Sequence, residues 1–109
     1  MSAAFGRRRS FDDLAESLRR DGYTVRFDAL LAGRSGVVHR FDLLAEKTEG
    51  GGEKRTVVCM KERGNNPVEE MVGLFAMAFD VGAEPCYAMR GGVEEVVAKS
   101  YGITLVENG

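Results

Sequence analysis

The sequence predicts a single α/β domain in which helices flank a mixed central sheet, in the order α-β-β-β-α-β-α-β. A chain of 109 residues, 44% hydrophobic and 29% charged, suits one domain with its own core. Residues 10–21 and 67–81 repeat apolar side chains every three or four positions, which is typical of helices. Between them, apolar and polar side chains alternate from one glycine-rich turn to the next, which is typical of strands.

Residues 10–21 are predicted to form the first helix. Ser10 suits the N-cap position, acidic residues follow in the first turn, and Gly22 suits the left-handed residue that ends many helices. One apolar stripe runs along this helix, formed by Phe11, Leu14, Ala15 and Leu18. Residues 1–9 are expected to form a flexible basic tail with Arg7, Arg8 and Arg9. An arginine triplet at a terminus is more often a solvated tail than a phosphate clamp.

Three strands are predicted at residues 23–31, 37–45 and 54–60, where apolar side chains recur at every second position. The sequence GRSG at 33–36 forms a turn between the first two strands, and three glycines at 50–52 separate the second from the third. Short connections of this kind join antiparallel neighbours. The three strands are therefore expected to form an antiparallel meander.

The second half of the chain alternates helices and strands. A long helix is predicted to begin at Pro67 and to end near Gly82, followed by a strand at 85–89, a helix at 93–101 and a strand at 103–106. Strands joined through a helix run parallel, with right-handed crossovers, so the whole sheet is mixed. The long helix is apolar nearly all round, and we expect it to pack against the sheet and against a second subunit in a homodimer.

Net charge and cysteine content narrow the class of protein. The formal charge is −2, so the chain as a whole has no strong attraction for nucleic acid, although a local basic face remains open. No segment approaches the run of about 20 apolar residues that a membrane span requires, and residues 1–4 lack the apolar segment of a secretory signal. Cys59 and Cys86 lie in apolar runs without zinc spacing, so both are expected to be buried thiols of a cytoplasmic protein.

An acid and a lysine lie near the hairpin of the second and third strands. The period of two predicts two faces for the second strand, one with Val38, Arg40, Asp42 and Leu44, the other with Val37, His39, Phe41, Leu43 and Ala45. In the third strand, Cys59 and Lys61 share a face. A carboxylate beside an ammonium group is able to hold Mg²⁺ or Mn²⁺ and to stabilise charge at an attacked phosphodiester. The alternative is an ordinary ion pair between Asp42 and either Arg40 or Lys61.

Three segments carry a resemblance to a known family: FDLLAEK at 41–47, TVVCMK at 56–61 and VVAKSYGITLVE at 96–107. They resemble the Mrr-type branch of the restriction-endonuclease-like proteins, which belongs to the PD-(D/E)xK nuclease superfamily. The resemblance runs from about Phe11 to Val106. It implies a single restriction-endonuclease-like domain over residues 10–109, in the same order of helices and strands that the periodicity predicts.

The resemblance also implies roles for individual residues. Asp42 matches the family's metal-binding aspartate, and Lys61 matches its catalytic lysine. Cys59 stands two positions before that lysine, where the family has Glu, Asp or, in the Mrr branch, often Gln. An acid of the first helix would complete the metal shell, with Asp12 as the better match and Glu16 as the second choice.

Two functions follow from this pattern. One is metal-dependent hydrolysis of DNA with Mg²⁺ or Mn²⁺, weakened because Cys59 is a soft ligand and Mg²⁺ prefers oxygen. The other is a catalytically inactive nuclease-fold module for binding, regulation or dimerisation. DNA is the expected partner in the first function. The candidate contacts to it are Arg7, Arg8, Arg9 and Arg34.

Overall fold

The computed structural model describes residues 11–64, 66–89 and 95–107, so the predicted basic tail at 1–9 and the Ser10 cap lie outside the described residues. In chain order the elements are α2 (Phe11–Arg20), β1 (Thr24–Ala32), β2 (Val38–Thr48), β3 (Lys54–Lys61), α3 (Pro67–Val81), β4 (Glu84–Met89), α4 (Glu95–Ser100) and β5 (Thr104–Glu107). The predicted order of elements is confirmed within this part of the chain.

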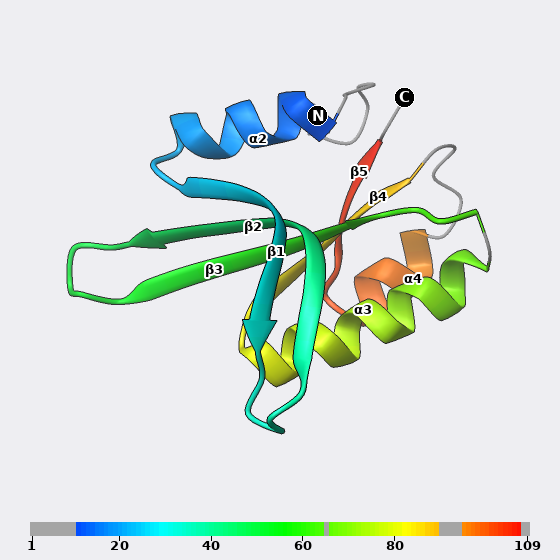
Figure 1. Ribbon diagram of the computed structural model, residues 1–109. Helices are drawn as coiled ribbons and strands as arrows, with labels where there is room; N and C mark the ends of the chain where they lie inside the picture. Colours follow the sequence, from blue (N-terminus) through cyan, green and yellow to red (C-terminus); the bar gives the residue numbers. More distant parts are fainter. Residues whose placement is uncertain (1–10, 65, 90–94, 108–109) are drawn as a thin grey trace.

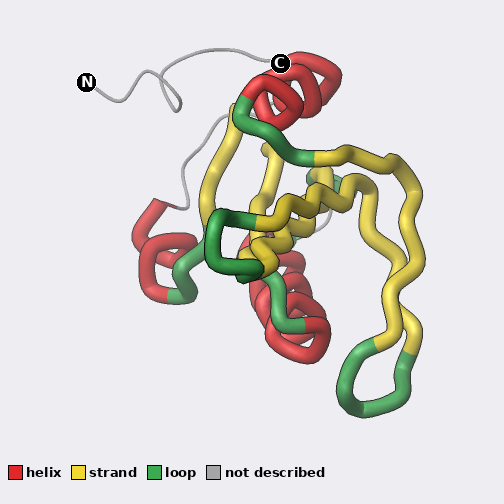
Figure 2. The backbone as a smooth tube through the Cα atoms, turned by 90° about the vertical axis from the view of Figure 1, so that its left-hand side faces the viewer, coloured by secondary structure: helices red, strands yellow, loops and turns green. Residues whose placement is uncertain are grey.

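The five strands form one mixed sheet in the order β1-β2-β3-β4-β5. β1, β2 and β3 pair antiparallel, as the predicted meander requires, while β4 and β5 are added parallel. The helices lie on both faces of this sheet, α2 on one and α3 with α4 on the other (Figures 1 and 2). No helix among the described residues is long and apolar enough to cross a membrane.

Each face of the sheet has its own apolar core. On the α2 face, Ala15 packs with Leu43, Ala45, Cys59, Cys86, Ala88 and Val106. On the α3 face, the buried residues include Phe41, Leu44, Val58, Met71, Leu74, Ala78, Tyr87, Ala98 and Leu105. Neighbouring residues of β3 and β4 contribute to opposite cores, which is the alternation that a strand buried on both faces requires.

The alternation predicted for β2 reverses at Asp42. Phe41 belongs to the core beneath α3, whereas Leu43 belongs to the core beneath α2, so the expectation that they share a face is wrong. The reversal coincides with Asp28 of the paired strand, whose φ of 50° lies in the left-handed region that aspartate tolerates better than most residues. The β1–β2 ribbon therefore turns over at this point and crosses α3 near the C-terminal end of that helix (Figure 1).

Helix α3 has well-defined ends. The Asn66 side chain accepts hydrogen bonds from the backbone N–H groups of Val68 and Glu69, and Gly82 ends the helix in the left-handed conformation. Its buried residues are Met71, Leu74 and Ala78. The expected packing of this helix against the sheet is confirmed. The opposite side of the helix is exposed in the single chain, and its contact with a second subunit stays a prediction.

The β1–β2 turn is fastened to the C-terminal end of α3 by Asp80. Its carboxylate accepts hydrogen bonds from the Ser35 N–H (2.9 Å) and hydroxyl (2.6 Å), and lies 2.8 Å from His39 Nε2. A side chain at Gly33 would overlap this carboxylate, with its Cβ 1.9 Å from Oδ2, so the close approach requires glycine. Arg34 donates to the Phe79 carbonyl at 3.2 Å. This predicted nucleic-acid contact therefore lies at the end of α3.

We expect that in the Asp80→Asn variant the free energy of unfolding falls less steeply as the pH is lowered. The Ser35 hydroxyl, His39 and the Ser35 N–H lower the pKa of Asp80 to about 2, against about 3.9 for an unperturbed aspartate. Because the native pKa is the lower one, the stabilisation is present above about pH 4 and is lost as the pH falls towards 2. Urea unfolding at several pH values should show a shallower loss of stability in that window for the variant.

Glu53→Gln, in the exposed β2–β3 turn, is the matched control and should leave the slope in this window unchanged. An Asp80→Asn protein with the same slope as the parent would contradict this role for Asp80.

Candidate functional site

Asp42 lies where β2 and β3 separate. β2 pairs with β3 from Leu43 to Thr48, and beyond this segment the two strands diverge (Figure 1). This part of β2 stays paired with β1 and crosses α3, while β3 continues beside β4 as far as Lys61 (Figure 1). The Asp42 side chain is 4% exposed, so its carboxylate fills the fork between the diverging strands.

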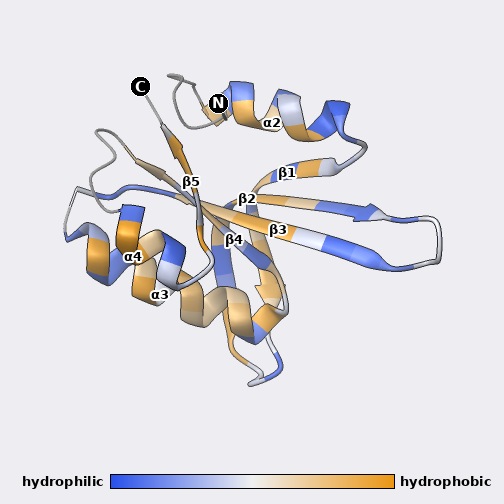
Figure 3. Cartoon of the chain, turned by 180° about the vertical axis from the view of Figure 1, so that it is seen from behind, coloured by the Kyte–Doolittle hydropathy of each residue, from blue (hydrophilic) through white to orange (hydrophobic). Residues whose placement is uncertain are grey.

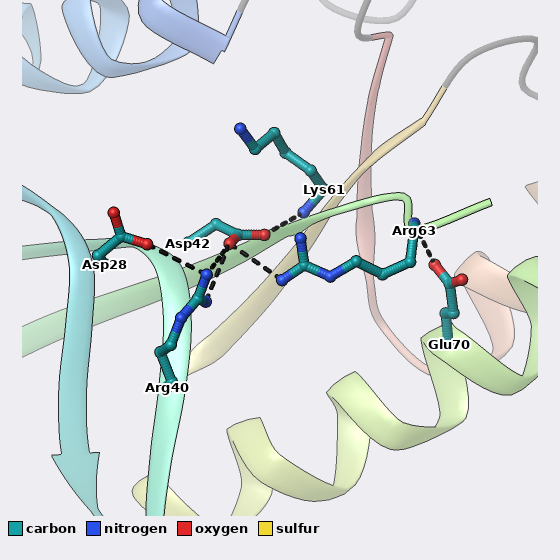
Figure 4. Close-up of polar contacts among 6 residues, drawn as sticks. All are labelled: Asp28, Arg40, Asp42, Lys61, Arg63 and Glu70. Carbon is teal, nitrogen blue, oxygen red and sulfur yellow. Dashed lines mark hydrogen bonds and ion pairs between the residues drawn. The ribbon is translucent and has the colours of Figure 1, made fainter. Parts of the chain in front are cut away.

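Both oxygens of the buried carboxylate accept hydrogen bonds. Oδ2 accepts the backbone N–H of Lys61 at 2.7 Å. Oδ1 accepts Nη1 and Nη2 of Arg40, both at 3.0 Å, and Nη2 of Arg63 at 3.1 Å (Figure 4). Arg40 also pairs with Asp28 at 3.1 Å. These donors supply the compensation that a carboxylate needs when it is withdrawn from water.

Lys61 contacts Asp42 through its backbone and not through its ammonium group. Its side chain points away from the carboxylate (Figure 4), and Nζ lies 5.1 Å from the centroid of the Phe11 ring. Of the two ordinary ion pairs considered for Asp42, the one with Arg40 is present. The metal-site roles of Asp42 and Lys61 stay predictions.

Arg63 is a site residue that the sequence analysis missed. It follows β3 by two positions, and the basic pattern of Lys61 and Arg63 was the available signal. Its backbone N–H donates to Glu70 at 2.9 Å, while its guanidinium donates to Asp42. Glu70 also accepts a hydrogen bond from the Tyr87 hydroxyl at 2.7 Å. The pKa of Tyr87 is raised mainly by its burial and to a smaller extent by this hydrogen bond. Arg63 is thus held at both its backbone and its side chain.

Cys59 belongs to the apolar core and not to the group of polar residues around Asp42. Its exposed fraction is 0%, and it lies opposite Leu43 on β2 and opposite Cys86 on β4. Burial raises the pKa of the Cys59 thiol well above its usual value, and a hydrogen bond with Cys86 raises it further. The group therefore stays a neutral thiol at neutral pH, whereas metal binding requires the thiolate. Both cysteines are free and buried, as predicted.

The acids expected to complete a metal shell do not assemble around Asp42. Asp12 and Glu16 are exposed on α2. Among residues 11–64, 66–89 and 95–107, no group of three His, Cys, Asp or Glu side chains is placed to hold a metal ion. Mg²⁺ needs several oxygen ligands, and the oxygens of Asp42 are occupied by N–H donors. This set of donors does not fit the magnesium site that the family resemblance implies.

The cluster around Asp42 exposes its cations more than the carboxylate at its centre. Arg40 and Arg63 pair with Asp42, and Arg40 also pairs with Asp28. Lys61 adds a cation that points away from Asp42, and Glu70 adds a carboxylate at the Arg63 backbone. The Arg40 and Arg63 side chains are 46% and 42% exposed, while the Asp42 carboxylate beneath them is covered. An approaching molecule therefore meets the two guanidinium groups and the exposed Asp28, and not the Asp42 carboxylate.

Comparison of the chain with family models, with curated proteins and with solved structures found no match. The resemblance to Mrr-type proteins therefore stays a prediction.

We expect Asp42→Asn to destabilise the fold by about 1–3 kcal/mol, because a neutral amide replaces a carboxylate that accepts charged and backbone donors in a buried position. Asp28→Asn is the matched control. It makes the same chemical change at a side chain that is 75% exposed, and should cost no more than about 0.5 kcal/mol. Urea unfolding measures both, and equal losses would contradict the structural role of Asp42.

We expect Cys59→Glu to destabilise the protein by about 3 kcal/mol or more, because a carboxylate would enter a fully buried apolar position. Cys59→Ala, which removes only the sulfur, should cost about 1 kcal/mol. Urea unfolding compares the two, and calorimetry follows Mn²⁺ binding. A stable Cys59→Glu protein that binds Mn²⁺ when the parent does not would instead identify Cys59 as the place of a lost metal ligand.

Proposed function

We propose that this chain is a DNA-binding module of restriction-endonuclease-like fold that contacts phosphate through Arg40, Arg63 and Lys61 without hydrolysing it. The observation that carries the proposal is the state of Asp42. Its carboxylate is held by two guanidinium groups and a backbone N–H, where a metal-dependent nuclease would need it free to bind a cation.

The geometry favours an anionic ligand. A guanidinium group has five N–H donors in one plane, and the bonds to Asp42 and Asp28 use only part of those on Arg40 and Arg63. The same bonds fix both side chains before a ligand arrives, which lowers the entropic cost of binding. A phosphodiester oxygen is an acceptor that arginine binds well.

The overall charge sets the expected strength of the interaction. At −2, the chain has no long-range attraction for nucleic acid as a whole. Binding then depends on the local cluster, whose three cations would contact about three phosphates. The logarithm of the association constant should accordingly fall with the logarithm of salt concentration with a slope of about −3.

We expect a labelled DNA duplex to bind in EDTA, as measured by fluorescence anisotropy. Arg40→Ala and Arg63→Ala should each weaken binding and reduce the magnitude of the salt slope by about one, because each removes one phosphate contact. Arg20→Ala, at the exposed last turn of α2, removes the same charge elsewhere and is the matched control. Equal losses in all three variants would mean that only net charge matters, and would overturn the assignment to this cluster.

Metal-dependent hydrolysis is the rival function, and a plasmid assay separates the two. Supercoiled plasmid incubated with the protein and Mg²⁺ or Mn²⁺ should remain uncut under the proposal. Cleavage that is lost in both Asp42→Ala and Lys61→Ala would overturn the proposal in favour of the nuclease roles that the family resemblance implies.

A further inference from the structure

One side of α3 forms an exposed apolar face, which we name the outer face of α3. Its members are Glu69, Val72, Gly73, Phe75, Ala76 and Phe79. Phe79 is 67% exposed, and its ring stacks on that of Phe75, with ring centroids 6.4 Å apart. The Phe75 ring also contacts the ring of Tyr101, just beyond α4, with ring centroids 5.1 Å apart. Figure 3 shows α3 and α4 with large apolar segments on this side of the sheet.

Opposite charges lie at the two ends of this face. Glu69 is in the first turn of α3. At the other end, the Arg34 guanidinium lies 5.5 Å from the centroid of the Phe79 ring and donates to the Phe79 carbonyl at 3.2 Å. The positions between Glu69 and Phe79 on the outer face carry no charge. A surface with an acid at one end and a base at the other is complementary to itself when the second copy runs antiparallel.

We propose that the outer face of α3 binds a second copy of this chain, with the two α3 helices antiparallel about a twofold axis that crosses the outer face at the level of residue 74. An axis at this position places Glu69 of each protomer beside Arg34 and Phe79 of the other. It also places large residues opposite small ones, Val72 against Ala76 and Phe75 against Gly73. Helix packing requires this fit of side chains into gaps.

Two further physical effects favour the same partner. Antiparallel helices bring the positive end of one macrodipole beside the negative end of the other. Apolar side chains gathered on one surface also gain free energy when a partner excludes water from them, by about 25 cal/mol per Å² buried. A partner with a different sequence would have to supply both the apolar pattern and the charge order that this chain already contains.

The first experiment measures the oligomeric state of the full chain by sedimentation velocity, with circular dichroism to confirm folding. The wild-type protein should be a dimer whose population rises with concentration. Phe79→Glu and Ala76→Glu should each shift it to monomer, because a charge enters the centre or edge of the apolar face. Val38→Glu is the matched control, since Val38 is 58% exposed on β2, outside this face, and its substitution should leave the dimer intact.

A charge exchange tests the antiparallel arrangement itself. Glu69→Arg and Arg34→Glu should each weaken self-association, because each homodimer then contains two like-charge contacts. An equimolar mixture of the two variants should recover dimers, since both contacts in the mixed dimer join opposite charges. A wild-type monomer at high concentration, a mixture that does not recover, or an equal effect of Val38→Glu would each overturn the proposal.

Discussion

The separation of β2 from β3 at Asp42 is the constraint on which the other features depend. Where two strands part, a backbone N–H that would have bonded to its neighbour loses that partner, and a buried unpaired donor is costly. The Asp42 carboxylate enters the gap and accepts the Lys61 N–H at 2.7 Å. Once the strands are free to diverge, β2 stays paired with β1 and crosses the C-terminal end of α3, while β3 runs towards the start of that helix (Figure 1).

The same aspartate links the fold to the candidate site. A buried carboxylate requires compensating charge, and here Arg40 and Arg63 supply it from two different segments of the chain. The guanidinium groups are thereby fixed at the surface above the fork, with Glu70 holding the backbone of Arg63. The position of these two guanidinium groups is consequently a product of the way in which the strand divergence is stabilised.

Local signals were enough to predict the order of helices and strands, because caps, glycine turns and apolar spacing are properties of short segments. Pro67 and Gly82 mark the ends of α3 as expected. The reversal at Asp42 was not predictable from a period of two, which assumes an even twist, and so Phe41 was placed on the wrong face. Arg63 and the direction of the Lys61 side chain depend on contacts between distant segments, for which periodicity contains no information.

The proposed function rests on a comparison between a bound divalent cation and a pair of guanidinium groups, which have similar electrostatic effects but different chemistry. A divalent cation and a pair of guanidinium groups can each balance a buried carboxylate and still attract a phosphate group. A metal ion also lowers the pKa of a bound water and so generates a nucleophile, whereas a guanidinium group has no open coordination position and does not release its proton near neutral pH. Replacing the cation by Arg40 and Arg63 would therefore retain phosphate binding and remove the means of hydrolysis. The neutral thiol of Cys59, enclosed in the core on the α2 face, is consistent with this separation because it adds no ligand to the fork.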